Sequence, residues 1–312
     1  MSLVQASEVQ TRTWASAAIG ILWGMTAALA WTGYNVGSRL GRMEGLQAVD
    51  MSMLRFGVAA LLLMPLVLSR RKTYRLGWGR LLSLTVLAGP LFGLLINTAF
   101  GLAPLSHAVV LTAGATMMSA NGLAWRLDGR RPPIFRLLGM MILIVGLLFI
   151  ASAQNPQMPQ STSQIWLGDL CFLAAGSLWG SFTYLLGRWK VDPIVGIGQV
   201  SFLSVFAFLP FFLARHHDGA ISSDVWMAQA FFQGILGGCL APVAIAKAVS
   251  RVGAGEAALF PALVPSGALL LAIPLLGEWP SYAEILGIGV CTLGLLTSFD
   301  LTRFLCKSRI SG

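Results

Sequence analysis

Ten apolar stretches, each long enough to cross a lipid bilayer as a helix, make up most of this 312-residue sequence. A hydrocarbon core of roughly 30 Å needs about 20 mostly apolar residues per helix. The expected spans lie near residues 15 to 38, 50 to 69, 81 to 98, 104 to 125, 135 to 153, 166 to 187, 194 to 214, 225 to 248, 255 to 276 and 283 to 302. Only 11% of the residues are charged, against about 25% in soluble domains. The sequence therefore predicts an all-α protein with the lipid bilayer as its main solvent.

The lysines and arginines fall almost entirely in alternate gaps between these stretches. One set of gaps and the two ends hold 17 of the 21, namely Arg12, Arg70, Arg71, Lys72, Arg75, Arg80, Arg126, Arg130, Arg131, Arg136, Arg188, Lys190, Lys247, Arg251, Arg303, Lys307 and Arg309. The opposite gaps hold Arg39, Arg42 and Arg215. Because cytoplasmic loops are enriched in Lys and Arg, residues 1–14 and 303–312 are expected to be cytoplasmic tails. This distribution, rather than a nucleic-acid partner, accounts for the net charge of +9.

The first apolar stretch has one alternative reading. It follows Arg12 and contains small residues at 27–30, as a cleaved signal peptide would. Cleavage there would leave nine spans and break the alternation of charge. We therefore keep the stretch as the first helix.

A polar, uncharged linker at residues 154–165 divides the chain into halves of five spans, at 15–153 and 166–302. Two related halves with an odd number of spans must insert with opposite orientation, which is the inverted-repeat plan of many secondary transporters. At an offset of 149, six residues of the first half coincide with identical residues of the second, including Gly89 with Gly238 and Ala99 with Ala248. Trp31 in the first span also has a counterpart in Trp179 of the sixth span.

Several motifs resemble those of EamA-type proteins of the drug/metabolite transporter superfamily. In the second half, the segment 257–265 contains Pro261 and Pro265 and is followed by Leu-Gly-Glu at 276–278, as in the helix of that family with a mid-span proline. In the first half, Arg55-Phe56 followed by small and aliphatic residues is similar to the family's second-helix motif. The resemblance runs from about 18 to 302 and implies two inverted five-helix repeats.

The first half departs from this pattern. At the offset of 149, Thr116 stands where the repeat expects a proline, and Asp128-Gly129 replaces Gly-Glu. The first half is therefore the degenerate copy.

The ionisable residues argue against an enzyme. All twelve acids lie in gaps or near helix ends, and the three histidines, His107, His216 and His217, lie at span edges. The four cysteines have no CxxC spacing, and no GxxxxGK[ST] loop for a nucleotide occurs. We expect no catalytic residue, metal or cofactor, and no proton pump built on a carboxylate at the middle of the membrane.

Polar and aromatic side chains within the spans are the candidates for substrate binding. Trp31, Tyr34 and Asn35 follow helical spacing and share one face, and similar groups recur in the third, fourth, sixth and ninth spans. The proposed set is Trp31, Tyr34, Asn35, Asn97, Thr98, Thr116, Trp179, Ser181, Tyr184, Pro265 and Ser266. Such a face suits a small amphiphilic solute. The alternative is that these groups serve only helix packing or the aromatic belt at the interface.

Three charges are assigned to gating or structure. Arg55 lies about one and a half turns from the outer end of its helix, so we expect it to reach the interface, with direct contact to an anionic substrate group as the alternative. Lys247 is expected to pair with Glu256 across a short turn.

The leading hypothesis, which depends on the family resemblance, is a secondary transporter of a small amphiphilic metabolite, such as an amino acid, in a bacterial inner membrane, with export as the expected direction. Access would alternate at the interface between the repeats. A non-transporting sensor or scaffold with the same fold, and a lipid flippase, are the alternatives.

Overall fold

The computed structural model describes residues 3–70, 76–129, 131–152, 161–214, 221–252, 257, 260–277 and 279–297, and all regular structure in them is helical. The helices are α1 (Leu3–Met43), α2 (Ala48–Arg70), α3 (Trp78–Ala88), α4 (Pro90–Leu102), α5 (Leu105–Asp128), α6 (Ile134–Ser152), α7 (Thr162–Arg188), α8 (Pro193–Ala214), α9 (Ser223–Gln229), η1 (Ala230–Leu240), α10 (Ala241–Val252), η2 (Pro261–Leu263), α12 (Val264–Leu276) and α13 (Tyr282–Thr297). The all-helical prediction is confirmed over these residues.

Six continuous segments are long and apolar enough to cross a membrane, at Ser16–Met43, Ala48–Arg70, Trp78–Leu102, Thr162–Arg188, Pro193–Ala214 and Ser223–Val252. Three shorter apolar helices lie at Ile134–Gly146, Val264–Leu276 and Tyr282–Gly294. Helix α5 is long but carries polar residues along its length, among them His107, Thr112 and Asn121. Length and hydropathy thus identify fewer spans than the ten expected, and ten stays a prediction.

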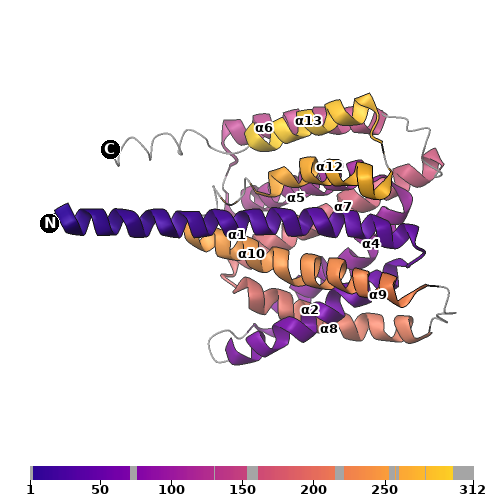
Figure 1. Cartoon of the computed structure of the whole chain (residues 1–312), viewed down its shortest axis with the longest axis horizontal. Helices are drawn as coiled ribbons and strands as arrows, with labels where there is room; N and C mark the ends of the chain where they lie inside the picture. The colour runs from indigo at the N-terminus through magenta and orange to yellow at the C-terminus, as the bar shows by residue number, and fades with distance from the viewer. Residues whose placement is uncertain are drawn as a thin grey trace.

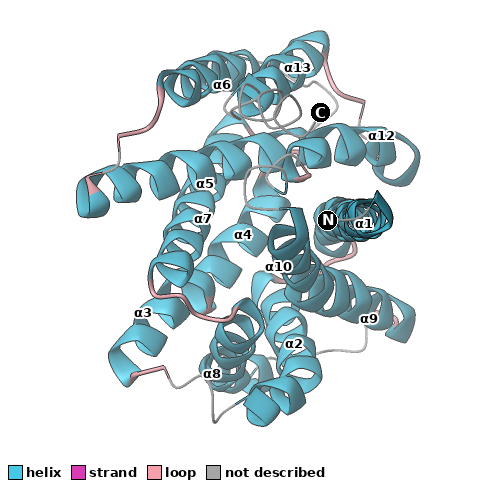
Figure 2. Cartoon of the chain, turned by 90° about the vertical axis from the view of Figure 1, so that its left-hand side faces the viewer, coloured by secondary structure: helices cyan, strands magenta, loops and turns pink. Residues whose placement is uncertain are grey.

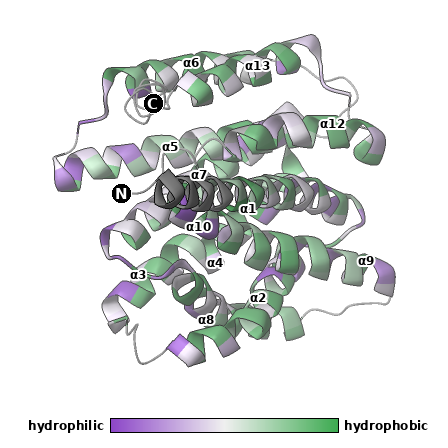
Figure 3. Cartoon of the chain, turned by 60° about the vertical axis from the view of Figure 1, so that its left-hand side comes forward, coloured by the Kyte–Doolittle hydropathy of each residue, from purple (hydrophilic) through white to green (hydrophobic). Residues whose placement is uncertain are grey.

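The outward surface of the bundle is apolar. Large side chains such as Leu29, Leu61 and Leu270 are more than 65% exposed. The hydrophobic residues run along the helices, and polar residues gather toward their ends (Figure 3). Because contiguous apolar surface of this extent does not suit water, the surface is that of an integral membrane protein.

The helices pack in a pattern that is unchanged when the two halves are exchanged. Helix α6 packs on α13 at one end of the bundle, and α2 packs on α8 at the other (Figures 1 and 2). Between these pairs, α4 and α5 of the first half pack on α7, while α10 and α12 of the second half pack on α1. Helix α1 begins and α13 ends on the same side of the bundle (Figure 1).

The third membrane segment of each half is interrupted. In the first half, Gly89 ends α3 and Pro90 begins α4, with Gly89 at φ −100° and ψ −125°. In the second half, the helix widens into the π-helix η1 between α9 and α10. Gly238, which corresponds to Gly89 at the offset of 149, lies within that π-helix. Interruptions at matching places in two repeats are typical of transporter binding sites.

Glycines set the distance between α5 and α7. A Cβ built on Gly176 would lie 2.5 Å from the Thr112 carbonyl oxygen, and one on Gly180 would lie 2.3 Å from that of Thr116. Backbone lies against backbone here, so neither contact can be relieved by turning a side chain. Small residues permit such close approach between membrane helices.

This packing predicts the effect of enlarging Gly180. Gly180→Ala should lower the free energy of unfolding in detergent by about 1 to 3 kcal/mol, because the methyl group overpacks the interface. Gly187→Ala, in the same helix but with open space around its Cβ, is the control and should be neutral or stabilising. Thermal unfolding compares the two. Equal melting temperatures for both variants would contradict the packing described here.

Candidate functional site

Arg55 of α2 is buried at the centre of the bundle. Arg55 is only 5% exposed, so the expectation that its side chain reaches the membrane–water interface is wrong. The guanidinium carbon lies 4.9 Å from the centre of the Tyr34 ring on α1 and 5.3 Å from that of Phe92 on α4. Three helices of the first half therefore meet around one positive charge.

The π-helix of the second half closes the site from the other side. A Cβ on Gly237 would lie 2.9 Å from Nη1 of Arg55 and 2.3 Å from the Tyr34 ring. A Cβ on Gly238 would lie 2.8 Å from the Arg55 carbonyl oxygen and 3.0 Å from Ala59. Only glycine at both positions lets η1 approach α2 this closely, and widened helical turns of this kind often mark functional sites.

A small cavity adjoins Arg55 at the junction of the two halves. Its lining residues come from α2, α3, α7, α8, η1 and α10 and are Arg55, Phe56, Ala88, Trp179, Phe182, Ile197, Val200, Ser201, Gly238 and Pro242. The Trp179 ring contacts Phe92 at 5.3 Å and Phe182 at 5.1 Å between centroids. The lining is thus aromatic and aliphatic, with one cation and no acidic residue.

The charge of Arg55 is incompletely compensated within the part of the chain that the structure describes. Moving an ion out of water costs several kcal/mol, and a cation over an aromatic face recovers about 2 kcal/mol when it is desolvated. Nη1 of Arg55 is buried and has no hydrogen-bond acceptor among the described residues. The two rings therefore offset part of the cost and leave a donor that an anion could satisfy.

Buried amides surround the site on the adjacent turns. Gln233 of η1 donates from Nε2 to the hydroxyl of Ser38 at 2.7 Å, and Asn97 of α4 donates to the hydroxyl of Ser52 at 3.1 Å. Ser52 lies one helical turn from Arg55. The carbonyl oxygens of both amides, Oε1 of Gln233 and Oδ1 of Asn97, are buried without a hydrogen-bond donor among the described residues.

Comparison with known families matches most of the sequence. The model of the EamA-like transporter family matches residues 18–152 and again residues 166–299. The chain belongs to the EamA-like transporter family. The resemblance to the drug/metabolite transporter superfamily is thereby confirmed, and the two matched segments show two EamA repeats.

A solved crystal structure has the same fold. The similarity covers 91% of this EamA chain and 98% of the other, with a TM-score of 0.63 and 17% sequence identity. At that identity the likeness concerns the fold alone. No curated protein matches the sequence.

Of the residues expected to bind substrate, the structure brings Tyr34 and Trp179 to the Arg55 site. Trp31 packs partly buried against the main core, and Asn35 donates to the Trp31 carbonyl oxygen at 2.8 Å. Asn97 is one of the two buried amides described above, and Thr98 beside it is half-buried.

The other expected binding residues lie elsewhere in this EamA protein. Thr116 donates to the Gly176 carbonyl oxygen at 3.0 Å, and Ser181 to that of Ser177 at 2.8 Å, so both hydroxyls have partners within the helix packing. Tyr184 donates to Asp128 at 2.8 Å. Pro265 is buried in the second cavity described below, whereas Ser266 is exposed.

The pair expected between Lys247 and Glu256 involves a residue outside the described part of the chain, namely Glu256. The ammonium nitrogen of Lys247 lies 4.1 Å from the centre of the Trp23 ring. Lys247 itself is exposed. Its described contact is therefore with an aromatic ring of α1.

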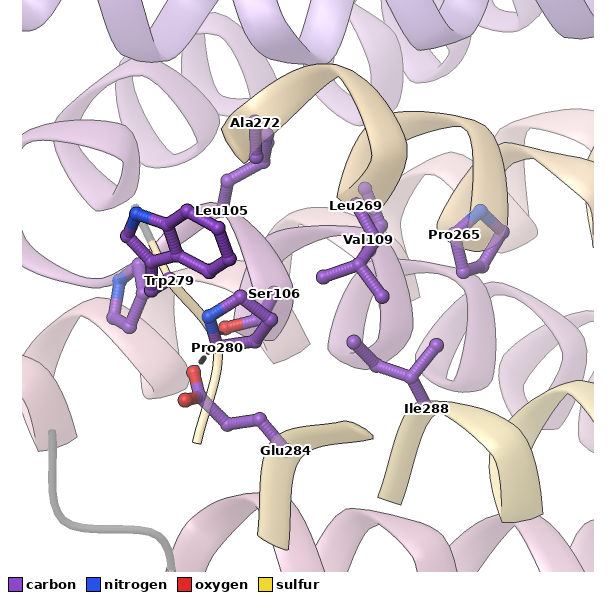
Figure 4. A pocket seen from close by; sticks show the side chains of 11 residues that line it. Leu105, Ser106, Val109, Pro265, Leu269, Ala272, Trp279, Pro280, Glu284 and Ile288 are labelled. Carbon is purple, nitrogen blue, oxygen red and sulfur yellow. Dashed lines mark hydrogen bonds between the residues drawn. The ribbon is translucent and has the colours of Figure 1, made fainter. Parts of the chain in front are cut away.

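A buried cluster near the starts of α5, α7 and α13 was missed by sequence reasoning. Nδ1 of His107 lies 2.8 Å from Asp169, Nε2 of His107 lies 3.9 Å from Glu284, and Ser106 donates to Glu284. Figure 4 shows the Ser106 hydroxyl directed at Glu284 beside a second small cavity. His107, Asp169 and Glu284 were expected at the edges of spans, but packing buries these three and Ser106 to 9% exposure or less.

Removing the imidazole should destabilise the protein. His107→Ala leaves the Asp169 carboxylate buried without this partner, a change that costs about 3 to 5 kcal/mol. Arg70→Gln removes an ion pair to Asp192 at 2.6 Å whose arginine side chain is 38% exposed, and should cost less than about 1 kcal/mol. Denaturation in detergent measures both. Equal losses in the free energy of unfolding for the two variants would contradict a structural role for the cluster.

Proposed function

We propose that this protein is a secondary transporter that moves a small amphiphilic metabolite, such as an amino acid or a related compound, out of a bacterial cell. The observation that carries the proposal is the cavity beside Arg55, which lies where the interrupted helices of both halves meet. In secondary transporters, helix interruptions in both repeats mark a binding site near the middle of the membrane. The family match supports transport as the activity.

The proposed architecture is ten membrane helices in two inverted repeats, with both termini in the cytoplasm of an inner-membrane protein. In this arrangement the segment α3–α4 counts as one span, as does α9–η1–α10. The symmetric packing of the halves and the distribution of 17 lysines and arginines against 3 support it.

Alternating access would arise by rocking the two halves about the Arg55 cavity. Trp179 and Phe182 of α7 line part of the cavity, and Arg55 and Phe56 of α2 line another part. These surfaces can separate at the expense of van der Waals contacts while the helices stay intact. A motion of this kind exposes the cavity first to one side of the membrane and then to the other.

Trp179 provides a test with a matched control. Trp179→Ala should reduce substrate counterflow in proteoliposomes by about tenfold or more, since it removes an aromatic wall of the cavity. Trp166→Ala changes an exposed tryptophan of the same helix and should leave counterflow unchanged. Radiolabelled amino acids, nucleosides and organic acids form the panel, and inside-out vesicles determine the direction.

The outcomes separate the proposed function from its alternatives. Accumulation in inside-out vesicles supports export. A wild-type protein that is folded and moves no member of the panel would favour a sensor or scaffold, and movement of labelled phospholipid alone would favour a flippase. Equal loss in both tryptophan variants would contradict the assignment of the cavity.

A further inference from the structure

The buried arginines of this protein differ in how their nitrogens are satisfied. Arg39 and Arg55 are both buried, at 4% and 5% exposure. Arg39 donates from Nη1 to the Phe100 carbonyl oxygen at 2.7 Å, and the half-buried Arg42 donates to that of Leu46 at 2.6 Å. Nη1 of Arg55 has no hydrogen-bond acceptor among the described residues, and the Arg55 side chain borders a cavity.

We infer that the transported substrate is a small organic anion whose carboxylate binds the guanidinium of Arg55 and whose apolar body packs against Trp179 and Phe182. This inference rests on the proposed transport function and names its substrate class. A guanidinium presents its donors in a planar fork that matches a carboxylate. The hydrogen bonds formed are charge-assisted and among the strong ones.

The residues that line the cavity favour an anionic ligand over a cationic one. None of its lining residues is acidic, and Ser201 is its other hydrogen-bonding side chain besides Arg55 and Trp179. A cationic ligand would bring a second positive charge into a site of low dielectric, where repulsion is strong. Amines that lack an anionic group should therefore be rejected.

The cavity also limits size. In this conformation the cavity has room for about one water molecule, so a substrate enters only when the surrounding helices separate. Trp179 and Phe182, whose ring centroids lie 5.1 Å apart, give an apolar wall. A monocarboxylate with a single ring or a short branched chain needs less separation of the helices than a nucleotide or a lipid would.

The two repeats are not equivalent at this position. At the offset of 149, Arg55 corresponds to Ser204 of α8. A Cβ on Gly238 would meet the backbone of Arg55, and a Cβ on Gly89 would meet Ser204 at 2.5 Å, so the two positions occupy corresponding places in space. Ser204 instead donates to the Val200 carbonyl oxygen at 2.7 Å. One half alone carries the cation, which indicates a single anionic group per bound substrate.

Matched compounds test the inference. The full-length protein in detergent is titrated with sets that share a body and differ in the head group, for example indole-3-acetate, indole-3-acetamide and tryptamine, with phenyl, isobutyl and cyclohexyl sets beside them. Phenyl phosphate is included to separate carboxylate from phosphate recognition. The readout is the concentration that gives half of the maximal rise in melting temperature.

At least one carboxylate should stabilise the wild-type protein at a concentration where its amide and amine do not. Arg55→Gln should raise the half-saturating concentration of that carboxylate about tenfold or more, and Arg55→Lys should retain part of the affinity. Arg80→Gln is the control, because Arg80 also lies over an aromatic ring, at 5.6 Å from Trp189, but is exposed. It should bind as the wild type does.

Several results would overturn the inference. They are stabilisation by amides or amines equal to that by carboxylates, unchanged affinity in Arg55→Gln and Arg55→Lys, preference for the phosphate, and failure of every carboxylate in the panel. Transport of neutral compounds alone would overturn the anionic substrate while leaving the transporter in place. Anion binding that depends on Arg55 without any transport would overturn the transporter instead.

Discussion

Placing the Arg55 guanidinium in an apolar interior is costly, and the helices around Arg55 are arranged in ways that reduce that cost. Desolvating an ion requires several kcal/mol. Two aromatic rings lie about 5 Å from the cation, and the glycines of η1 keep the site narrow by letting the backbone of the second half approach. Since Nη1 of Arg55 still lacks an acceptor among the described residues, the site is built to gain from an anion.

The repeat structure explains why this site lies where it does. Exchanging the halves maps the packing of the helices onto itself, and the interruptions at Gly89 and in η1 fall at corresponding places. A duplicated five-helix unit thus brings two weakened helices together at its own interface. Position 204, which corresponds to Arg55, is a serine, so the paired site is asymmetric.

Patterns local in sequence predicted much of the fold and part of the site. Apolar length and periodicity predicted helices throughout, and the mid-membrane faces of the first and sixth spans included Tyr34 and Trp179, which meet Arg55 and its cavity. The depth of Arg55 was misjudged because the distance from a helix end says nothing about which neighbours cover that turn. Helix α2 is covered there by α4 and η1, elements remote in sequence.

Long-range packing also explains why the cluster of His107, Asp169 and Glu284 was missed. The imidazole and the Asp169 carboxylate are 62 residues apart, and no local motif links them. Thr116 and Ser181 were predicted to bind substrate because their spacing was consistent with a polar helix face. In the structure each hydroxyl instead donates a hydrogen bond to a backbone carbonyl oxygen. Residue spacing shows which side chains share one face of a helix, but it does not show which other helices pack against that face.

Accessibility of the cavity from both sides of the membrane tests the central claim most directly. Ser201→Cys places a thiol in the cavity, in a protein whose native cysteines Cys171, Cys239, Cys291 and Cys306 are replaced by alanine. A membrane-impermeant maleimide is then applied to right-side-out or inside-out vesicles. Alternating access predicts modification from either side, and modification from one side alone, or from neither, would contradict it.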